Sequence, residues 1–414
     1  MKYYCFAESR IGKMFLGFLM LVLLLLARDT MIFHCLVGFN RSYAITIAVL
    51  GVAGVVFLWH NKQSIKMILT DKRVLLLAVT AVVYLLPMAV KQDWQLMHIT
   101  ILLGSCVAVF MSYFVSHKQI ARSYVVFMAI LALYSLIATY FLRNFADSGL
   151  FEVQTFSNAG VRDYYNFVLA FPSVEEHRSR NFGMFREPGV YQFFILLALF
   201  LNNWKVEWDK SWKLWGINMI LAVTMLSTQS TNGVVELGLL AVLLFIDKKL
   251  YQNKPIMILF VSACVALIGV VTYSLLTKTL LYDYLDSVFY KLFRQSNSTT
   301  ARMESILVDT QFFLRNPIFG EKLATVLHAV VDNTSSTMIL FAMYGLMGGF
   351  IHIAGWTALV WDRQRNLLLN LGFLVTMLMS FNTQNLTWDI MFWLFPMMAL
   401  TEKTVPWLEK RLAK

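Results

Sequence analysis

A series of long apolar runs, the first at residues 14–27, constrains this chain more than any other feature. Of its 414 residues, 58% are hydrophobic and 14% are charged, where a soluble domain carries about 25% charged residues. Runs of about 20 apolar residues suit the hydrocarbon core of a bilayer. Lipid offers the backbone no hydrogen-bond partners, so such runs must be helical. We therefore predict an all-α, polytopic integral membrane protein.

About twelve transmembrane helices are expected. They lie near residues 13–27, 43–59, 73–90, 97–115, 122–142, 188–203, 214–229, 233–246, 256–276, 334–361, 367–381 and 386–401. No internal repeat, low-complexity tract or soluble domain interrupts them, so residues 1–414 are expected to form a single membrane domain. The first run lacks a clear cleavage site and is interpreted as a retained helix.

Lysine and arginine mark alternate connections, which fixes the expected orientation. Basic residues favour the cytoplasmic side of short loops. Most of the 35 Lys and Arg fall in every second connection, whereas the short loops between them hold only Arg28, Arg41 and Lys91. We expect an even number of spans, both termini in the cytoplasm, and two long extracytoplasmic loops at 143–187 and 277–333. This distribution explains the net charge of +11 without a nucleic-acid partner.

The first long loop ends in "SRNFGMFREPG", a charged turn directly before an apolar helix. Its middle is aromatic and is expected to fold back on the membrane as short amphipathic helices. Pro188 suits the first turn of the next helix, and Glu187 would lie at the positive end of that helix dipole. Arg180 and Arg186 either contact lipid headgroups, pair with nearby acids (Glu175, Glu176 or Glu187), or bind a ligand.

The second long loop contains a helix-spaced stretch, "ARMESILVDTQFFLRNP", followed by the turn "NPIFGEK". Ser298, Thr299 or Thr300 is expected to cap this helix, which places Arg302 near its start. His328 follows, shortly before the next span. A lone histidine at a membrane surface is more often structural than catalytic, so both roles stay open.

Several arginines with one acid and one histidine outside the membrane suit phosphate chemistry. Arginine binds phosphates bidentately and keeps its charge. A diphosphate leaving group gains negative charge as its bond breaks, and fixed cations stabilise that charge without a metal. His328 or Glu187 would accept the proton of an attacking hydroxyl. The four cysteines are scattered and indicate neither a disulfide framework nor a metal site. An anion transporter would use the same cations.

Four stretches resemble the O-antigen polymerase and O-antigen ligase superfamily of bacterial envelope glycosyltransferases. They are "SRNFGMFREPGVYQ", "LSTQSTNGVVELGLLAVLL", "TTARMESILVDTQFFLRNPIFGEK" and "HAVVDNTSSTMILFAMYGLMGG". Their order and spacing on one predicted side carry the resemblance, which covers roughly residues 175 to 350. One departure matters: many members place arginine in the serine-rich turn, where this chain has Thr231 and Asn232.

The resemblance implies a metal-independent, inverting transfer from an undecaprenyl-diphosphate-linked oligosaccharide in the bacterial cytoplasmic membrane, with no cofactor. By position, Arg302 and His328 match the family's loop arginine and histidine, and Arg180 opens the first motif, which contains Arg186 and Glu187. The three arginines are expected to bind the diphosphate, with His328 the first choice and Glu187 the second for activating the acceptor. Membrane lipids are further expected partners, as are a chain-length regulator and a repeat-unit flippase.

Other functions remain open at this point. A ligase moving finished glycan onto lipid A–core would share the donor. A transporter or flippase predicts ionisable residues at mid-span or broken helices, for which Glu236, Asp389 and Pro87 are the candidates. A scaffold that only organises other enzymes is the fourth possibility. The glutamate-proline-glycine segment favours the polymerase.

Overall fold

A computed structural model describes residues 9–33, 39–61, 73–148, 153–157, 161–174, 180–278, 297–330 and 333–412. The chain is mostly helical. Its helices are α2 (Arg10–Leu25), α3 (Phe39–Asn61), α5 (Arg73–Lys91), α6 (Leu96–Met111), α7 (His117–Tyr140), η2 (Leu142–Ser148), α8 (Pro188–Trp204), α9 (Ser211–Ser227), α10 (Thr231–Asp247), η3 (Leu250–Gln252), α11 (Lys254–Thr277), α13 (Asn297–Arg315), α14 (Leu323–His328), α15 (Ser336–Val360), α16 (Leu367–Phe381) and α17 (Ile390–Leu412).

Every helix predicted from an apolar run has a counterpart in the structure. The agreement is closest for α16, whose bounds are Leu367–Phe381, and for α8, which begins at Pro188 as expected. Three of the described helices are long and apolar enough to cross a membrane, namely α5, α7 and α15. The mostly helical character of the chain is therefore confirmed, and the length and composition of these three helices suit membrane spans.

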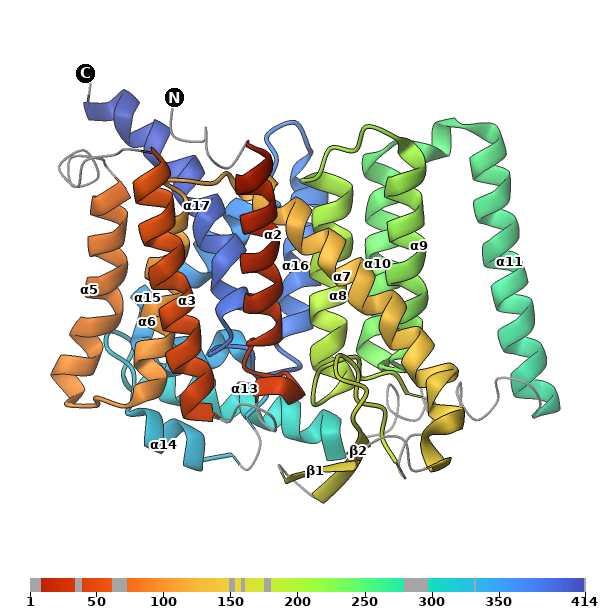
Figure 1. Cartoon of the computed structure of the whole chain (residues 1–414), viewed down its shortest axis with the longest axis horizontal. Coiled ribbons are helices and arrows are strands. Elements are labelled where there is room, and N and C mark those ends of the chain that lie inside the picture. Colours follow the sequence, from red (N-terminus) through yellow and green to blue (C-terminus); the bar gives the residue numbers. More distant parts are fainter. Residues whose placement is uncertain are drawn as a thin grey trace.

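The helices run alongside one another as a bundle with two distinct ends (Figure 1). The start of α2 and the end of α17 lie at the same end, and the basic connections after α8 and α10 lie there too. The helices α13 and α14 and a small β-hairpin lie at the opposite end, called the loop end below. Elements of both long loops therefore gather on one side, away from the basic connections.

Burial separates the inner helices from the outer ones. Almost every residue of α8 between Val190 and Leu201 is buried, and α17 packs closely against α6 and α15. Large apolar side chains remain exposed on outer helices such as α5 and α11, for example Leu75, Val265 and Leu276. Exposed apolar surface on this scale is rare on soluble monomers. It suits a lipid environment.

The first long loop differs from the expected short amphipathic helices. After η2, strands β1 (Val153–Ser157) and β2 (Val161–Tyr165) pair antiparallel, with Thr155 opposite Asp163. The Thr155 hydroxyl donates a hydrogen bond of 2.6 Å to Asp163 Oδ1. β-Branched and aromatic side chains in these segments favour extended backbone. The expectation of short helices in the middle of this loop is therefore wrong, because these side chains pair across two strands instead.

The second long loop contains the predicted helix, α13. The proposed caps Ser298, Thr299 and Thr300 lie inside its first turn. The turn at residues 316–320 then packs into a break in α15 at Gly345, whose φ is +64°. The amide of Leu346 donates to the carbonyl of Pro317 (2.7 Å), and that of Glu321 to Ala342 (2.7 Å). This contact fixes the path from α13 to α14 against α15.

Candidate functional site

The segment that opens "SRNFGMF" lies against the serine-rich turn between α9 and α10. The amide of Asn181 donates to the carbonyl of Ser227 (2.9 Å), and Arg180 Nε donates to the carbonyl of Thr228 (3.1 Å). The Asn181 side chain also donates to Ser135 Oγ on α7 (2.9 Å). Arg180 therefore brings a guanidinium to the serine-rich turn, where this chain has Thr231 and Asn232 instead of an arginine of its own.

A buried polar cluster lies directly inside this turn, and we call it the Glu236 cluster. Gln192 Nε2 donates to Glu236 Oε2 (3.1 Å), and Asn232 Nδ2 donates to Glu236 Oε1 and to Thr383 Oγ1 (3.2 Å). The Ser230 hydroxyl donates to Gln192 Oε1. Glu236 is fully buried, but it lies in the second turn of α10, near the loop end. Polar neighbours thus explain this acid better than a mid-span ion pathway.

Arg302 lies over the Glu236 cluster from α13. Its side chain is half-buried, and its positive charge acts on the carboxylate of Glu236. Arg180 and Arg302 belong to different long loops, yet both lie around the first turns of α10. The amide groups of a helix N-terminus also attract anions. Two fixed cations and a helix start therefore face the same region at the loop end.

A buried carboxyl group holds α13 in this position. Asn333 Nδ2 donates to both carboxyl oxygens of Asp309, at 2.8 and 3.0 Å. The amide of Thr334 donates to Ser305 Oγ (3.3 Å), and the Ser335 hydroxyl donates to Asn382 Oδ1 (3.2 Å). Burial raises the pKa of Asp309 to about 7, and the hydrogen bonds from Asn333 act in the opposite direction. These contacts connect α13 to the start of α15 and to the 382–384 turn.

Arg186 is paired with an acid that the sequence did not indicate. Its Nε lies 2.8 Å from Asp29 Oδ1, and its backbone amide donates to the Asp29 carbonyl (3.0 Å). The Asp29 side chain is 1% exposed and that of Arg186 is 15% exposed. Arg186 thus forms an ion pair, which is one of the three predicted roles, but its partner is Asp29. The predicted partners Glu175 and Glu176 lie outside the described residues. Its guanidinium anchors this segment to the loop after α2.

Glu187 and His328 occupy different surroundings. Glu187 is the half-buried N-cap of α8, with Pro188 in the first turn as predicted. A Cβ added to Gly189 would lie 2.4 Å from the Gln384 side chain, so the start of α8 packs on the 382–384 turn. His328 is the last residue of α14 and is exposed.

The helix that carries His328 is attached elsewhere at the loop end. The amide of Leu323, which starts α14, donates to Asp93 Oδ2 on the α5–α6 connection (2.6 Å). Neither His328 nor Glu187 makes a side-chain hydrogen bond or ion pair within the part of the chain that the structure describes. The structure thus brings Arg180 and Arg302 to α10 and places Glu187 at the helix start that packs on the 382–384 turn. His328 lies on α14, which is held by Asp93 of the α5–α6 connection.

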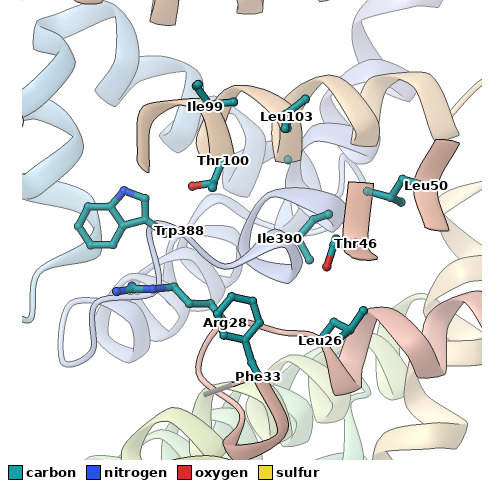
Figure 2. A pocket seen from close by; sticks show the side chains of 11 residues that line it. Leu26, Arg28, Phe33, Thr46, Leu50, Ile99, Thr100, Leu103, Trp388 and Ile390 are labelled. Atoms are coloured by element: carbon teal, nitrogen blue, oxygen red, sulfur yellow. The ribbon is translucent and has the colours of Figure 1, made fainter. Parts of the chain in front are cut away.

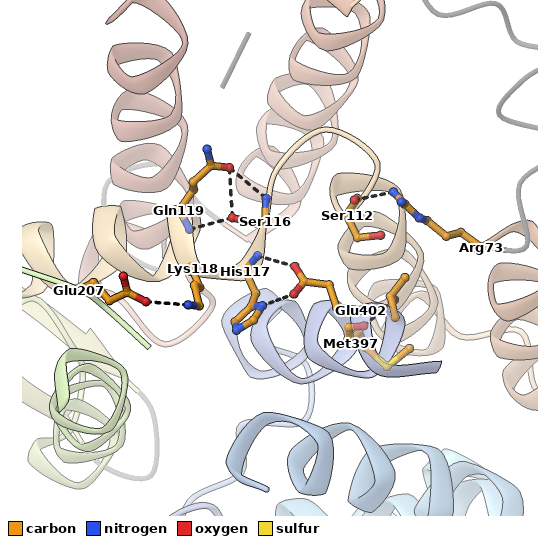
Figure 3. A network of polar contacts seen from close by, with 10 residues as sticks. Arg73, Ser112, Ser116, His117, Lys118, Gln119, Glu207, Met397 and Glu402 are labelled. Atoms are coloured by element: carbon orange, nitrogen blue, oxygen red, sulfur yellow. Dashed lines mark hydrogen bonds and ion pairs between the residues drawn. The ribbon is translucent and has the colours of Figure 1, made fainter. Parts of the chain in front are cut away.

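A second polar network lies at the opposite end of the bundle (Figure 3). The amide of His117 donates to Glu402 Oε1 (2.7 Å), and its ring bonds the other carboxylate oxygen. Arg73 donates to the Ser112 carbonyl (2.6 Å), and Lys118 pairs with Glu207 (2.8 Å). These contacts fix the α6–α7 connection to α17 and lie far along the bundle from the Glu236 cluster.

The described residues contain no group of three or more His, Cys, Asp and Glu side chains that could hold a metal ion. Comparison of the chain with family models, curated proteins and solved structures gave no match. The proposed function therefore rests on the motifs and on the geometry around α10.

Proposed function

We propose that this protein is a polymerase that joins undecaprenyl-diphosphate-linked oligosaccharide repeat units at the outer face of a bacterial cytoplasmic membrane. In this proposal the twelve long helices cross the membrane, both termini are cytoplasmic, and the loop end is extracytoplasmic. The observation that carries the proposal is the position of Arg180 and Arg302. They come from two separate loops and lie around the start of α10.

The reaction needs charge stabilisation more than covalent help from the protein. A hydroxyl of the acceptor glycan attacks the anomeric carbon of the donor, and the bond from that carbon to the diphosphate oxygen breaks. The electron pair leaves with undecaprenyl diphosphate, so negative charge grows where Arg180 and Arg302 are proposed to bind. Cations that are already in place stabilise such a transition state. Attack from the opposite face gives inversion at the anomeric carbon.

The proton of the acceptor hydroxyl must go to a base at the loop end. Glu187 is the N-cap of α8, and Gly189 in the first turn of that helix packs against the turn that contributes Thr383 to the Glu236 cluster. This location supports Glu187 as the base. His328 is supported by the family resemblance and by its exposed position on α14. Both stay candidates for acceptor activation or positioning.

The ion pair with Asp29 gives Arg186 a structural role in this proposal. A diphosphate would have to compete with a carboxylate that is 1% exposed and 2.8 Å away. Breaking a buried pair leaves an uncompensated charge and costs several kcal/mol. We therefore assign donor binding to Arg180 and Arg302.

The rival transporter function finds little support in the helix break. The carbonyl of Met343, two residues before Gly345, accepts from Lys91 Nζ, and that of Ala342 accepts from the Glu321 amide. Transporters leave such groups to coordinate ions or substrate. A ligase would use the same donor site, and the acceptor distinguishes the two enzymes.

Polymer length in cells tests the proposal. Arg302→Ala should remove long glycan chains while the protein still inserts, because one of the two donor-binding cations is lost. Loss of a single such group typically lowers the rate about 100- to 1,000-fold, which corresponds to about 2.7–4 kcal/mol in activation free energy. Arg315→Ala is the matched control, since Arg315 is exposed at the other end of the same helix. Long chains at normal levels in Arg302→Ala cells would refute the assigned role.

A further inference from the structure

An apolar groove runs between α3 and α6 from the loop end into the bundle. The part nearest the loop end is a cavity of about 60 Å³, with Arg28 and Trp388 at one end and Thr46 and Leu50 at the other (Figure 2). Leu50 and Leu103 also line a second hollow of about 300 Å³, further along the same two helices. From Thr46 to Val55 this α3–α6 groove extends about 14 Å along the helix axis.

The end of the groove nearest the loop end carries hydrogen-bond donors that the protein leaves unsatisfied. The Arg28 guanidinium lies 4.9 Å from the centroid of the Trp388 ring. Arg28 Nε and Trp388 Nε1 are buried and have no hydrogen-bond partner among the described residues, and Trp388 is 4% exposed. Buried donors without partners cost about 1–3 kcal/mol each. A phosphate oxygen at this position would accept from both.

Two acids lie near Arg28, and Asp389 Oδ2 is buried without a hydrogen-bond partner among the described residues. The Asp29 carboxylate faces Arg186. Asp389 accepts a hydrogen bond of 2.8 Å from the Met391 amide, and it lies within electrostatic range of Arg28. Arg28 is nevertheless the charged side chain that lines the cavity itself. The groove is thus lined by apolar side chains with the Arg28 guanidinium at its head, and Asp389 lies close enough to offset part of that charge.

The dimensions favour one branched chain. A space of about 10–15 Å³ holds one water-sized group, so the cavity beside Arg28 takes four to six such groups, roughly one phosphate group. The second hollow, of about 300 Å³, has room for several five-carbon isoprenoid units. A diacyl phospholipid would need space for two chains side by side. A single prenyl chain with a phosphate head matches both the shape and the charge.

We propose that the α3–α6 groove binds the polyprenyl diphosphate of the acceptor substrate, with Arg28 and Trp388 at its phosphates. This inference rests on the proposed function, because repeat-unit polymerisation brings together two lipid-linked glycans. Arg180 and Arg302 bind the diphosphate that leaves, whereas the groove holds the one that stays attached. A lipid A–core acceptor, with its several acyl chains, would not fit this groove.

Gly51 offers a way to fill the groove without disturbing the fold. It lines the second hollow, of about 300 Å³, and a Cβ added there would meet nothing within 4 Å. Gly51→Phe should therefore place a ring where the chain binds. Gly216→Phe is the matched control. Gly216 is equally open, and it lines a different apolar groove of about 320 Å³ between α7 and α9.

Counting bound lipids on the full-length protein tests the inference. Native mass spectrometry would titrate undecaprenyl diphosphate, with phosphatidylglycerol and undecaprenol as comparison lipids. We expect two undecaprenyl diphosphates per wild-type or Gly216→Phe chain and one per Gly51→Phe chain. Arg28→Gln should weaken one of the two sites at least tenfold, and phosphatidylglycerol should not displace the lipid from either.

The outcomes separate this inference from the proposed function. Two lipids bound to both Gly51→Phe and Arg28→Gln at wild-type affinity would overturn the groove assignment, as would displacement by phosphatidylglycerol. A single wild-type lipid lost in Arg302→Ala but kept in Gly51→Phe would also overturn it, while leaving the donor site intact. A lipid lost in Gly51→Phe but unaffected by Arg302→Ala and Arg180→Gln would support the groove and contradict the donor site.

Discussion

The docking of α13 should depend on pH through Asp309. This residue lies outside the proposed membrane spans, is fully buried, and accepts both of its hydrogen bonds from Asn333. Burial raises the pKa of Asp309 from 3.8 to about 7, because the ionised form loses its hydration. When α13 separates from α15, the carboxyl group returns to water and to its ordinary pKa.

The sign and size follow from these two values. Between pH 4 and pH 7 the docked state keeps a proton that the undocked state has released, so docking weakens as the pH rises through this window. Above about pH 7 both states are ionised and the dependence ends. From pH 5 to pH 7.5 the expected loss is about 2–3 kcal/mol, roughly one to two orders of magnitude in the docking equilibrium.

Amide hydrogen exchange of α13, corrected for the intrinsic pH dependence of exchange, measures this equilibrium. Protection should fall by roughly one to two orders of magnitude between pH 5 and pH 7.5 in the wild type. In Asp309→Asn it should be independent of pH, because the amide keeps the shape and cannot ionise. Glu304→Gln is the control, since Glu304 is exposed on the same helix. Constant wild-type protection across this range, or an unchanged slope in Asp309→Asn, would refute the reasoning.

Two further predictions concern stability. Asp29→Asn should lower the stability of the detergent-solubilised protein by roughly 3 kcal/mol in a thermal unfolding assay, because it leaves Arg186 without its buried partner. A change below about 0.5 kcal/mol would contradict the anchoring role of this ion pair. Gly345→Ala should cost more than about 2 kcal/mol, because φ is +64° and the new Cβ would lie 2.2 Å from the Ile318 carbonyl oxygen. Gly238→Ala, in α10 with open space around it, should be neutral or stabilising in the same thermal assay, and equal effects of the two changes would contradict the helix break.

The helices were predictable because their signal is local and strong. A run of apolar residues bounded by charges, as at 367–381, has few alternatives in lipid. Proline at the start of α8 and the helix spacing around Arg302 were also sufficient to place those elements. Alternation of basic connections correctly separated the two ends of the bundle, since α13 and α14 lie opposite the basic connections.

Contacts between distant segments were not predictable from one sequence. The pairing of Asp29 with Arg186 and of Asp309 with Asn333 depends on how loops fold back over the bundle, and neither acid stands in a recognisable motif. The break at Gly345 depends on the turn at 316–320 that packs into it. The β-hairpin was missed because its five-residue strands are too short to show a clear alternation.

Synthesis by the purified chain tests the central claim most directly. Full-length protein in lipid nanodiscs would receive undecaprenyl-diphosphate-linked repeat units and no other enzyme, and glycan length and released undecaprenyl diphosphate would be measured together. The account predicts lengthening chains, one undecaprenyl diphosphate released per new linkage, and loss of both signals in Arg180→Gln and Arg302→Ala. Chains that fail to lengthen with active wild-type preparations, or that lengthen equally in both arginine variants, would contradict it.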